Sequence, residues 1–450
     1  MSFPRYPKYK ASGVEWLGDV PAHWAIPLIK RTTYLKARVG WKGLTSEEFR
    51  DNAFAYLVTG SDFRGKFVEW DKCYQVERDR YEDDPFIQLE NGDLLITKDG
   101  TIGKLAIVSG LDRPACLNSG IFVARPRNTY STPFMYWILS SRVFSVFCDL
   151  KSFGCTINHL YQNVLEQFAF PAPPESEQTA IAAFLDRETA KIDGLVAEQR
   201  RLMELLKEKR QAVISHAVTK GLNPSAKMKP SGVEWLGDVP EGWGFKPLKH
   251  LGSIISGFAF KSTDFKPQGV RVLKIANIQT RVIDWSDDSY LPDDFYDKHI
   301  QFAVKDGDVV FALTRPIIST GLKAAIANIG SDRVLLNQRN AIFRPSEWLN
   351  KKFLYYILFC DSFKSDFLNR IDFTGLQPNI SPVDISNIKV LFPSTDDQSA
   401  IAKFLDFETA EFDTLTAEAQ RAIDLLQERR TALISAAVTG QIDVRNQPRN

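Results

Sequence analysis

Two loops rich in basic and hydroxyl side chains are candidates for contact with a polyanion. Each follows a short apolar run that opens with a Gly-Asp turn, at residues 93–97 in the first half of the chain and 308–312 in the second. The loops span residues 98–104 and 315–323, and an apolar run returns after each. Lysine and arginine bind phosphates and guanine edges, and Ser and Thr bond to phosphates and bases. A strand–loop–strand unit of this composition can therefore bring side chains to nucleic acid.

Further basic and amide side chains accompany these loops. In the first half, the candidates for DNA contact are Arg64, Lys66, Lys98, Thr101 and Lys104. In the second half, they are Lys261, Gln279, Arg281, Arg315, Ser319, Thr320, Lys323 and Arg339. For any one of them, a solvated surface charge is at least as good an interpretation as a DNA contact. Only the set as a whole favours DNA.

The sequence contains no evident catalytic or metal-binding pattern, so we predict no catalytic residue, no metal site and no cofactor in this chain. Residues 60–66 fit the first seven positions of a phosphate-binding loop, but Phe67 stands where such a loop needs a metal-binding Ser or Thr. The five cysteines form no Cys-x-x-Cys pair, which indicates reduced thiols rather than a zinc site or a disulfide framework. They are Cys73, Cys116, Cys148, Cys155 and Cys360.

The elements that carry these loops are written twice along the chain. Residues 12–21 recur without change as residues 231–240, at an offset of 219. Residues 178–186 return almost unchanged as residues 398–406, at an offset of 220. The blocks of about 170 residues between these repeats differ much more, although both keep the Gly-Asp turn. Similar ends with dissimilar middles indicate a common framework that carries two different recognition surfaces.

A long segment with helical apolar periodicity closes each half. Residues 176–219 predict one helix of roughly 44 residues, about 65 Å long at 1.5 Å per residue, and the repeat predicts a counterpart after Pro393. Apolar residues fall at heptad spacing and predict a helix–helix seam. The seam residues are Leu185, Ile192, Leu195, Leu202 and Leu206 in the first helix, and Leu405, Phe412, Leu415 and Leu426 in the second. We expect an antiparallel coiled coil; the alternative is that each helix packs only on its own block.

The chain is expected to be an α+β protein with a pseudo-two-fold internal repeat. The predicted segments are a strand-rich α/β block at 1–172, a helix at 173–222, a second block at 223–392, and a second helix with a tail at 393–450. The blocks carry 21 basic against 19 acidic residues and 21 against 18, whereas the last segment carries 6 against 10. Positive charge is thus mildly concentrated in the blocks. Without a membrane-spanning run or a signal peptide, we expect a cytoplasmic protein that does not bind membranes.

Taken together, these motifs resemble those of the specificity subunits of Type I restriction-modification systems. The resemblance rests on the two copies of residues 12–21, on the helix openings at Gln178 and Gln398, and on residues 256–261 and 375–380. Residues 154–159, the first-half counterpart of 375–380, depart from the family motif. The doubled arrangement covers essentially the whole chain, which makes the resemblance far more specific than any single motif.

This resemblance implies two target-recognition domains, each of which reads one part of an interrupted, asymmetric site in double-stranded DNA. It also implies that the paired helices set the spacer and bind two methyltransferase subunits, which hold S-adenosylmethionine and methylate adenine at N6. Restriction subunits, which hold ATP and Mg²⁺ and act as motor and nuclease, would then join the complex. The chain itself is expected to be non-catalytic and to hold no cofactor.

Three other interpretations stay open. The chain could be the specificity chain of a related restriction system whose nuclease and methylase are fused, and the neighbouring genes would separate that case. It could be a coiled-coil scaffold that does not touch DNA, in which case its binding should not depend on DNA sequence. It could be a tandem hydrolase or nuclease with an unfamiliar site, which should turn over substrate without partners.

Overall fold

The computed structural model describes residues 3–38, 44–151, 159–233 and 236–447. The chain forms two compact units, one built from residues 1–200 and 421–450 and the other from residues 201–420. Each unit combines a strand-rich globular part with half of each of two long helices. This confirms the predicted α+β class with two related domains and two long helices. In the part of the chain that the structure describes, no helix is both long and apolar enough to cross a membrane.

The first unit is built around a six-stranded sheet, in the order β3-β11-β8-β9-β6-β5, and a three-stranded sheet, in the order β10-β4-β7. Side chains of the central strand β8 point alternately to its two faces. Leu94 and Ile96 pack with helices α3 and α4, whereas Leu95 packs with the smaller sheet. Because β8 is buried on both faces, its sequence is a continuous apolar run. The elements are β3 (Thr33–Ala37), β4 (Ala55–Val58), β5 (Phe63–Arg64), β6 (Phe67–Val68), β7 (Tyr74–Val76), β8 (Leu94–Thr97), β9 (Leu105–Ile107), β10 (Ala115–Leu117), β11 (Ile121–Pro126), α3 (Thr132–Leu139) and α4 (Arg142–Lys151).

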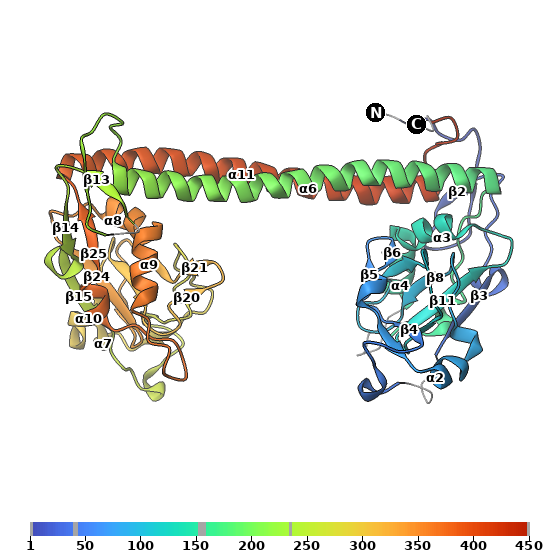
Figure 1. Ribbon diagram of the computed structural model, residues 1–450, viewed down its shortest axis with the longest axis horizontal. Helices are drawn as coiled ribbons and strands as arrows, with labels where there is room; N and C mark the ends of the chain where they lie inside the picture. Colours follow the sequence, from blue (N-terminus) through green and yellow to red (C-terminus); the bar gives the residue numbers. More distant parts are fainter. Residues whose placement is uncertain (1–2, 39–43, 152–158, 234–235, 448–450) are drawn as a thin grey trace. The chain divides into compact units, whose positions relative to one another are not determined.

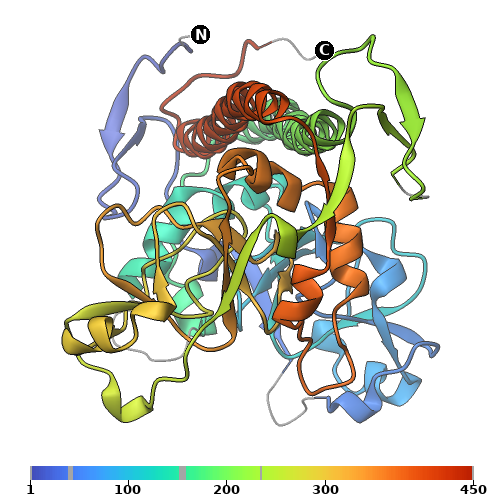
Figure 2. The same ribbon diagram turned by 90° about the vertical axis from the view of Figure 1, so that its left-hand side faces the viewer.

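The second unit repeats this plan with two four-stranded sheets, in the orders β15-β24-β19-β22 and β17-β16-β23-β18. In its central strand β19, Val309 and Phe311 face helices α8 and α9, and Val310 faces the second sheet. In Figure 2, where this unit faces the viewer, orange helices lie between the long helices and the strands. The elements are β15 (Gly252–Ser256), β16 (Val270–Leu273), β17 (Tyr290–Leu291), β18 (Ala303–Val304), β19 (Val309–Ala312), β20 (Ile317–Ile318), β21 (Gly321–Leu322), β22 (Ala324–Ile326), β23 (Val334–Leu336), β24 (Asn340–Pro345), α8 (Lys351–Leu358) and α9 (Asp361–Asn369).

The repeated residues 12–21 and 231–240 belong to matching antiparallel strand pairs. These are β1 (Tyr9–Ala11) with β2 (Asp19–Pro21), and β12 (Met228–Pro230) with β13 (Asp238–Pro240). Each pair is followed by a buried tryptophan, Trp24 or Trp243. In the second unit, β14 (Gly244–Pro247) then pairs with β25 (Lys389–Phe392), just before the second long helix. The shorter helices are α1 (Ile29–Thr32), α2 (Arg78–Glu82), α5 (Gln162–Leu165), α7 (Asp294–Lys298) and α10 (Pro382–Ser386).

The aspartates of the two Gly-Asp turns, Asp93 and Asp308, are buried and form ion pairs that stabilise the fold. Asp93 and Asp308 are each 3% exposed at the start of the central strand. Arg125 binds both carboxylate oxygens of Asp93, at 2.6 and 2.8 Å, and Arg344 binds those of Asp308, at 2.9 and 2.6 Å. Bidentate pairs of this kind fix geometry as well as charge. The divergent blocks therefore keep one ion pair that ties the central strand to its neighbour.

The long helices are α6 (Glu175–Lys220) and α11 (Thr395–Val438). In the first unit, the beginning of α6 packs on the end of α11, with Leu185 and Val438 in one core. In the second unit, the end of α6 packs on the beginning of α11, with Val218 and Leu405 in one core. Figure 1 shows the halves side by side in each unit. Both units thus have the expected antiparallel pairing, and each long helix contacts the other as well as a globular part.

One row of the predicted helix–helix seam is buried as expected, and the other row is exposed. Leu185, Ile192, Leu206, Leu405 and Phe412 are buried as expected, and Leu426 is half-buried. The exposed fractions of Leu195, Leu202 and Leu415, however, are 53%, 43% and 45%. The second row of the seam instead contains Thr189, Val196, Thr409 and Ile423, all buried. These four residues lie four positions after Leu185, Ile192, Leu405 and Ala419. The two threonines and the valine give a weaker hydrophobic signal than the neighbouring leucines.

Two ion pairs at repeat-related positions mark the antiparallel register. Arg430 binds both carboxylate oxygens of Asp193, at 2.8 and 3.2 Å, in the first unit. Arg210 binds Asp413 at 2.6 Å in the second unit. Each pair is separated from its counterpart by the 220-residue offset of the repeat. Partly exposed ion pairs add little to stability, so we assign them to the choice of register.

The repeated helix opening ties each helix to its own globular part. Asp186 accepts hydrogen bonds from Trp137 at 2.9 Å and from Lys66 at 2.5 Å. Its counterpart Asp406 accepts from Tyr356 at 2.7 Å and from Lys352. Gln178 and Gln398, which open the motif, bind backbone groups of the preceding loop and of the segment before α3 or α8. The motif is therefore kept in both halves of the chain because its side chains fix the start of each long helix against its own globular part.

A buried carboxylate joins the two ends of the described chain in the first unit. Glu177, which is 7% exposed, accepts hydrogen bonds from Tyr6 at 3.0 Å and Trp24 at 3.1 Å, and its other oxygen lies 2.7 Å from His23 Nε2. Arg445 lies over the Tyr6 ring, 4.8 Å from its centre. Burial and the Glu177 charge raise the pKa of Tyr6 far above its usual value, so this phenol stays a hydrogen-bond donor.

Candidate nucleic-acid interface

In the second unit, three chain segments meet beside the end of β19, where the sequence predicts a DNA-binding loop. Arg315 donates its backbone N–H to the carbonyl of Pro378 at 2.7 Å. Leu313 donates to the carbonyl of Arg339 at 2.7 Å and accepts from the N–H of Ile380 at 2.9 Å. Because these bonds join the segments through their backbones, the side chains of Arg315 and Arg339 are presented from a fixed frame.

Three arginines of this unit have backbone angles in the left-handed region, which residues other than glycine rarely adopt. The φ angles are +70° at Arg281, +46° at Arg315 and +67° at Arg339, and the fourth described non-glycine residue of this kind is Asn128. Such conformations cost on the order of 1–3 kcal/mol each and persist where the surrounding structure enforces them, often at binding sites. All three arginines are predicted DNA contacts, so the backbone and the sequence indicate the same loops.

Arg315 and Arg339 have exposed side chains, and neither forms an ion pair with a described carboxylate. Ser319 and Thr320 are exposed at the tip of the β20–β21 hairpin, which the loop after β19 forms. Thr320 Oγ1 lies 2.9 Å from the hydroxyl of Thr280. Unpaired cations beside hydroxyl groups on ordered loops suit phosphate and base-edge contacts.

Lys323 and Arg281 point into the protein, which the sequence does not reveal. Lys323 is 9% exposed and donates from Nζ to the carbonyl of Ile275 at 2.7 Å, and burial lowers its pKa. The guanidinium of Arg281 lies 4.8 Å from the centre of the Phe359 ring. Burial, together with the nearby positive charge of Arg210, lowers the pKa of Arg281. Both cations are engaged within the second unit in this conformation.

Lys261 and Gln279 lie on neighbouring loops of the same unit. Lys261 is exposed at the start of a short 3-10 turn. Its loop reaches the Arg339 segment because Gln338 donates a backbone hydrogen bond to Phe258 at 2.8 Å. Gln279 is half-buried, and its side-chain amide donates to the backbone of its own turn at 2.8 Å.

In the first unit, the loop after β8 is held in a tight turn. Thr97 donates from its hydroxyl to the carbonyl of Thr101 at 2.5 Å and accepts from the N–H of Lys104 at 2.9 Å. The side chains of Thr101 and Lys104 are exposed. Lys98 is half-buried, with Nζ 5.7 Å from the centre of the Phe122 ring. The loop therefore presents one hydroxyl and one cation from a fixed backbone, as in the second unit.

A histidine that the sequence analysis did not assign lies against this loop. His159 Nδ1 bonds to the carboxylate of Asp99, and the two residues form a backbone bridge. In the second unit, the corresponding bridge joins Thr314 to Asn379. The match shows that the segment before each long helix closes over the loop after the central strand. Residues 154–158, which depart from the family motif, lie outside the described residues.

Arg64 is the last residue of β5, and Lys66 lies in the turn between β5 and β6. Arg64 is exposed and pairs with Glu69 at 2.8 Å. Lys66 Nζ pairs with Asp186 of α6 and lies 5.4 Å from the centre of the Tyr136 ring. Lys66 is thus engaged in attaching the sheet to the helix, whereas the exposed pair at Arg64 can exchange its partner for a phosphate.

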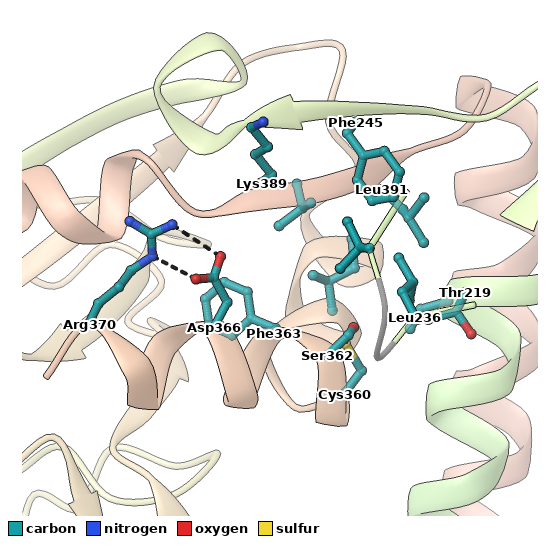
Figure 3. Close-up of a pocket in the computed structure, with 14 residues that line it drawn as sticks. Thr219, Leu236, Phe245, Cys360, Ser362, Phe363, Asp366, Arg370, Lys389 and Leu391 are labelled. Carbon is teal, nitrogen blue, oxygen red and sulfur yellow. Dashed lines mark hydrogen bonds and ion pairs between the residues drawn. The ribbon is translucent and has the colours of Figure 1, made fainter. Parts of the chain in front are cut away.

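A cavity of about 280 Å³ lies in the second unit, between the end of α6, helix α9 and strands β14 and β25. Figure 3 shows the guanidinium of Arg370 turned to the carboxylate of Asp366, at 2.8 and 3.3 Å. Burial raises the pKa of the Cys360 thiol, which disfavours the reactive thiolate. The charged pair is satisfied within the protein, so the cavity adds no chemistry to the candidate interface. Elsewhere among the described residues, no group of three His, Cys, Asp or Glu could hold a metal ion.

Comparison with known proteins indicates the same family in both halves of the chain. The family model of the Type I restriction modification DNA specificity domain matches twice, at residues 42–201 and 240–423. The Type I restriction enzyme MjaVIII specificity subunit of Methanocaldococcus jannaschii is 28% identical over 80% of this chain and 83% of that protein. The EcoKI specificity subunit of Escherichia coli K12 is 21% identical over 94% of this chain and 90% of that protein.

A solved structure has the same fold. The HsdS subunit from Thermoanaerobacter tengcongensis superimposes with a TM-score of 0.56, at 15% identity, over 96% of this chain and all of that one. The two family matches each cover most of one strand-rich block together with the first part of the following long helix. The chain therefore belongs to the family of Type I restriction-modification DNA specificity subunits.

Proposed function

We propose that this chain reads double-stranded DNA through the loop that follows the central strand of each unit. The observation that carries the proposal is the pair of exposed, unpaired cations in the second unit, Arg315 and Arg339, on backbone held at positive φ. Lys104 and Thr101 hold the matching position in the first unit. Phosphate contacts would set the register on the duplex, and base-edge contacts would specify the sequence.

The predicted contact residues divide into two groups on this proposal. The side chains that face DNA are exposed, except for the half-buried Lys98 and Gln279: Arg64, Lys98, Thr101 and Lys104 in the first unit, and Lys261, Gln279, Arg315, Ser319, Thr320 and Arg339 in the second. The cations of Lys66, Arg281 and Lys323 support the loops from within, because a carboxylate, an aromatic ring or a backbone carbonyl of the protein engages each of them. Few contacts per unit imply weak binding by the chain alone.

The DNA site is proposed to be split and asymmetric. The two units share a framework but present different side chains, so the two half-sites should differ in sequence. Two linked modules gain from effective concentration only when both half-sites lie at the right separation and helical phase. The long helices α6 and α11, which join the two blocks in sequence, are therefore proposed to set the length of the unread spacer.

Catalysis is proposed to reside on partner subunits. Two methyltransferase subunits would hold S-adenosylmethionine and methylate adenine at N6, and restriction subunits would hold ATP and Mg²⁺. Leu195 in the first unit, and Leu202 and Leu415 in the second, expose apolar surface on the long helices. Exposed leucines on an otherwise charged helix are suited to a protein partner, so we assign them to methyltransferase docking rather than to the seam.

The test is selection of binding sites from random duplexes by the complex of this chain with its methyltransferase. The wild type should select a two-part motif, Arg315→Ala should relax the second part, and Lys104→Ala the first. Lys364→Ala, which removes an exposed cation from α9, serves as a control and should leave both parts unchanged. Selection of no motif by the wild type would favour a scaffold that does not bind DNA.

A further inference from the structure

A loop in the second unit holds two apolar side chains in solvent. Leu376 is fully exposed, at 107% of its reference area, and Phe373 is 66% exposed. Both belong to the tip loop, residues 372–379, which follows α9. Figures 1 and 2 show this orange-red loop at the end of the unit remote from the long helices. A single exposed apolar residue is ordinary, but two on one loop indicate a binding surface.

The tip loop is ordered by its own hydrogen bonds. Asp372 and Asn379 exchange backbone hydrogen bonds of 2.7 and 3.0 Å across its base. The Asp372 carboxylate accepts from the N–H and the hydroxyl of Thr374, at 2.8 and 2.6 Å. Asn379 donates from its side-chain amide to the carbonyl of Gln377 at 2.8 Å. Leu376 is therefore held outward by a pre-formed turn, and insertion would need little further ordering.

Positive charge flanks the base of this loop. Arg315 bonds through its backbone to Pro378, and Arg339 is joined to the same frame through Leu313. Both guanidinium groups are exposed without a described carboxylate partner. The carboxylate of Asp372, within the loop, accepts hydrogen bonds from Thr374. Exposed apolar side chains on a loop whose base is joined to two unpaired cations fit a polyanion with a stacked apolar interior. Duplex DNA matches this description better than an apolar protein surface does.

We propose that Leu376 is a wedge that enters the base stack of the second half-site, with Phe373 as a second apolar contact from the same loop. Apolar side chains inserted between base pairs unstack the step and kink the duplex. Arg315 and Arg339 would hold the phosphates on either side of the opened step. This inference rests on the proposed DNA-reading function. It further predicts that the DNA is unstacked and bent at one step, which recognition by hydrogen bonds alone would not require.

A sequence preference follows at a position that no polar side chain reads. Pyrimidine–purine steps unstack more easily than other steps, so the wedge should favour them. Replacing such a step within the half-site should weaken binding by the wild type more than binding by a variant without the wedge. Leu376 would then determine specificity through DNA deformability.

The experiment places 2-aminopurine at successive positions of the second half-site and measures its fluorescence on binding the complete methyltransferase complex. The wild type should raise the fluorescence at one step severalfold, and Leu376→Ala should abolish that rise and weaken binding about tenfold, within the usual effect of one lost specific contact. Val383→Ala is the control, because Val383 is also an exposed apolar residue, at 66%, but lies on α10 and not on the tip loop. It should change neither signal.

Three results would overturn the wedge. Unchanged fluorescence in Leu376→Ala at every position would show that Leu376 does not enter the stack. A loss of methyltransferase association in Leu376→Ala, without any DNA effect, would make the tip loop a protein-docking surface. An equal response from Val383→Ala would show a general disturbance of the unit. The DNA-reading function itself fails separately, if Arg315→Ala leaves the selected motif and the affinity unchanged.

Discussion

Ile192 and Leu195 provide a direct test of the helix seam, because they stand three residues apart on α6 with opposite burial. Ile192 is 6% exposed and Leu195 is 53% exposed. Truncating a buried isoleucine to alanine removes its transfer free energy and leaves a cavity, at a cost of about 2–5 kcal/mol. Truncating a half-exposed surface residue costs about 0.5 kcal/mol or less. For a unit of this size, Ile192→Ala should lower Tm by roughly 5–15 °C, and Leu195→Ala by 2 °C or less.

The assay is thermal unfolding of the full chain followed by circular dichroism, with the same comparison at the repeat-related pair in the second unit. Phe412→Ala, at a residue 6% exposed, should lower the free energy of unfolding by about 3–5 kcal/mol. Leu415→Ala should have little effect. Equal losses of Tm in Leu195→Ala and Ile192→Ala would refute the seam described here and restore the row of leucines that the sequence predicts.

Three further predictions follow from the contacts described. Lys323→Met should leave DNA affinity unchanged. Because the pKa of Lys323 is lowered in the folded state, the unfolded chain binds more protons, so the stability of the wild type should rise with pH through the folded-state pKa and level off near 10.4. Urea titrations at a series of pH values should show this rise for the wild type and not for the variant. Deleting residues 198–204 together with 419–425, segments that the two ion pairs place opposite each other, shortens both helices by about 10 Å. The preferred DNA spacer should then become shorter by about three base pairs. An unchanged spacer in site selection would contradict the proposal that the long helices set the spacer length. Glu177→Ala removes the acceptor of a buried cluster and should lower the free energy of unfolding by about 2 kcal/mol, whereas Glu175→Ala, at an exposed position of the same turn, should change it little in calorimetry.

The internal repeat was sufficient to predict the architecture, because it repeats the residues that join elements together. Asp186 and Asp406 were visible as repeated letters, and their role became clear only when Trp137 and Tyr356 were found to donate to them. The first seam row was predicted correctly from the spacing of Leu185 and its successors. The second row was not, because Thr189 and its repeat-related residues give little hydrophobic signal, and their hydroxyls are satisfied within the helix.

The candidate interface could be predicted less fully than the fold. The strand–loop pattern located Arg315 and Lys104 correctly on exposed loops. It could not separate them from Lys66 and Lys323, because the direction of a long side chain depends on tertiary neighbours such as Asp186 and the carbonyl of Ile275. Leu376 belongs to the family motif at residues 375–380, but its exposure could not be predicted, because a leucine in a sequence is normally interpreted as a core residue.

The most direct test of the DNA-reading function is a genome-wide map of adenine methylation in a host that expresses this chain with its methyltransferase, with and without the gene for this chain. A split, asymmetric motif that is methylated only when this chain is present, and whose second part broadens in Arg315→Ala, is the predicted result. Methylation that is unchanged by removal of this chain, with both proteins folded and associated, would contradict it.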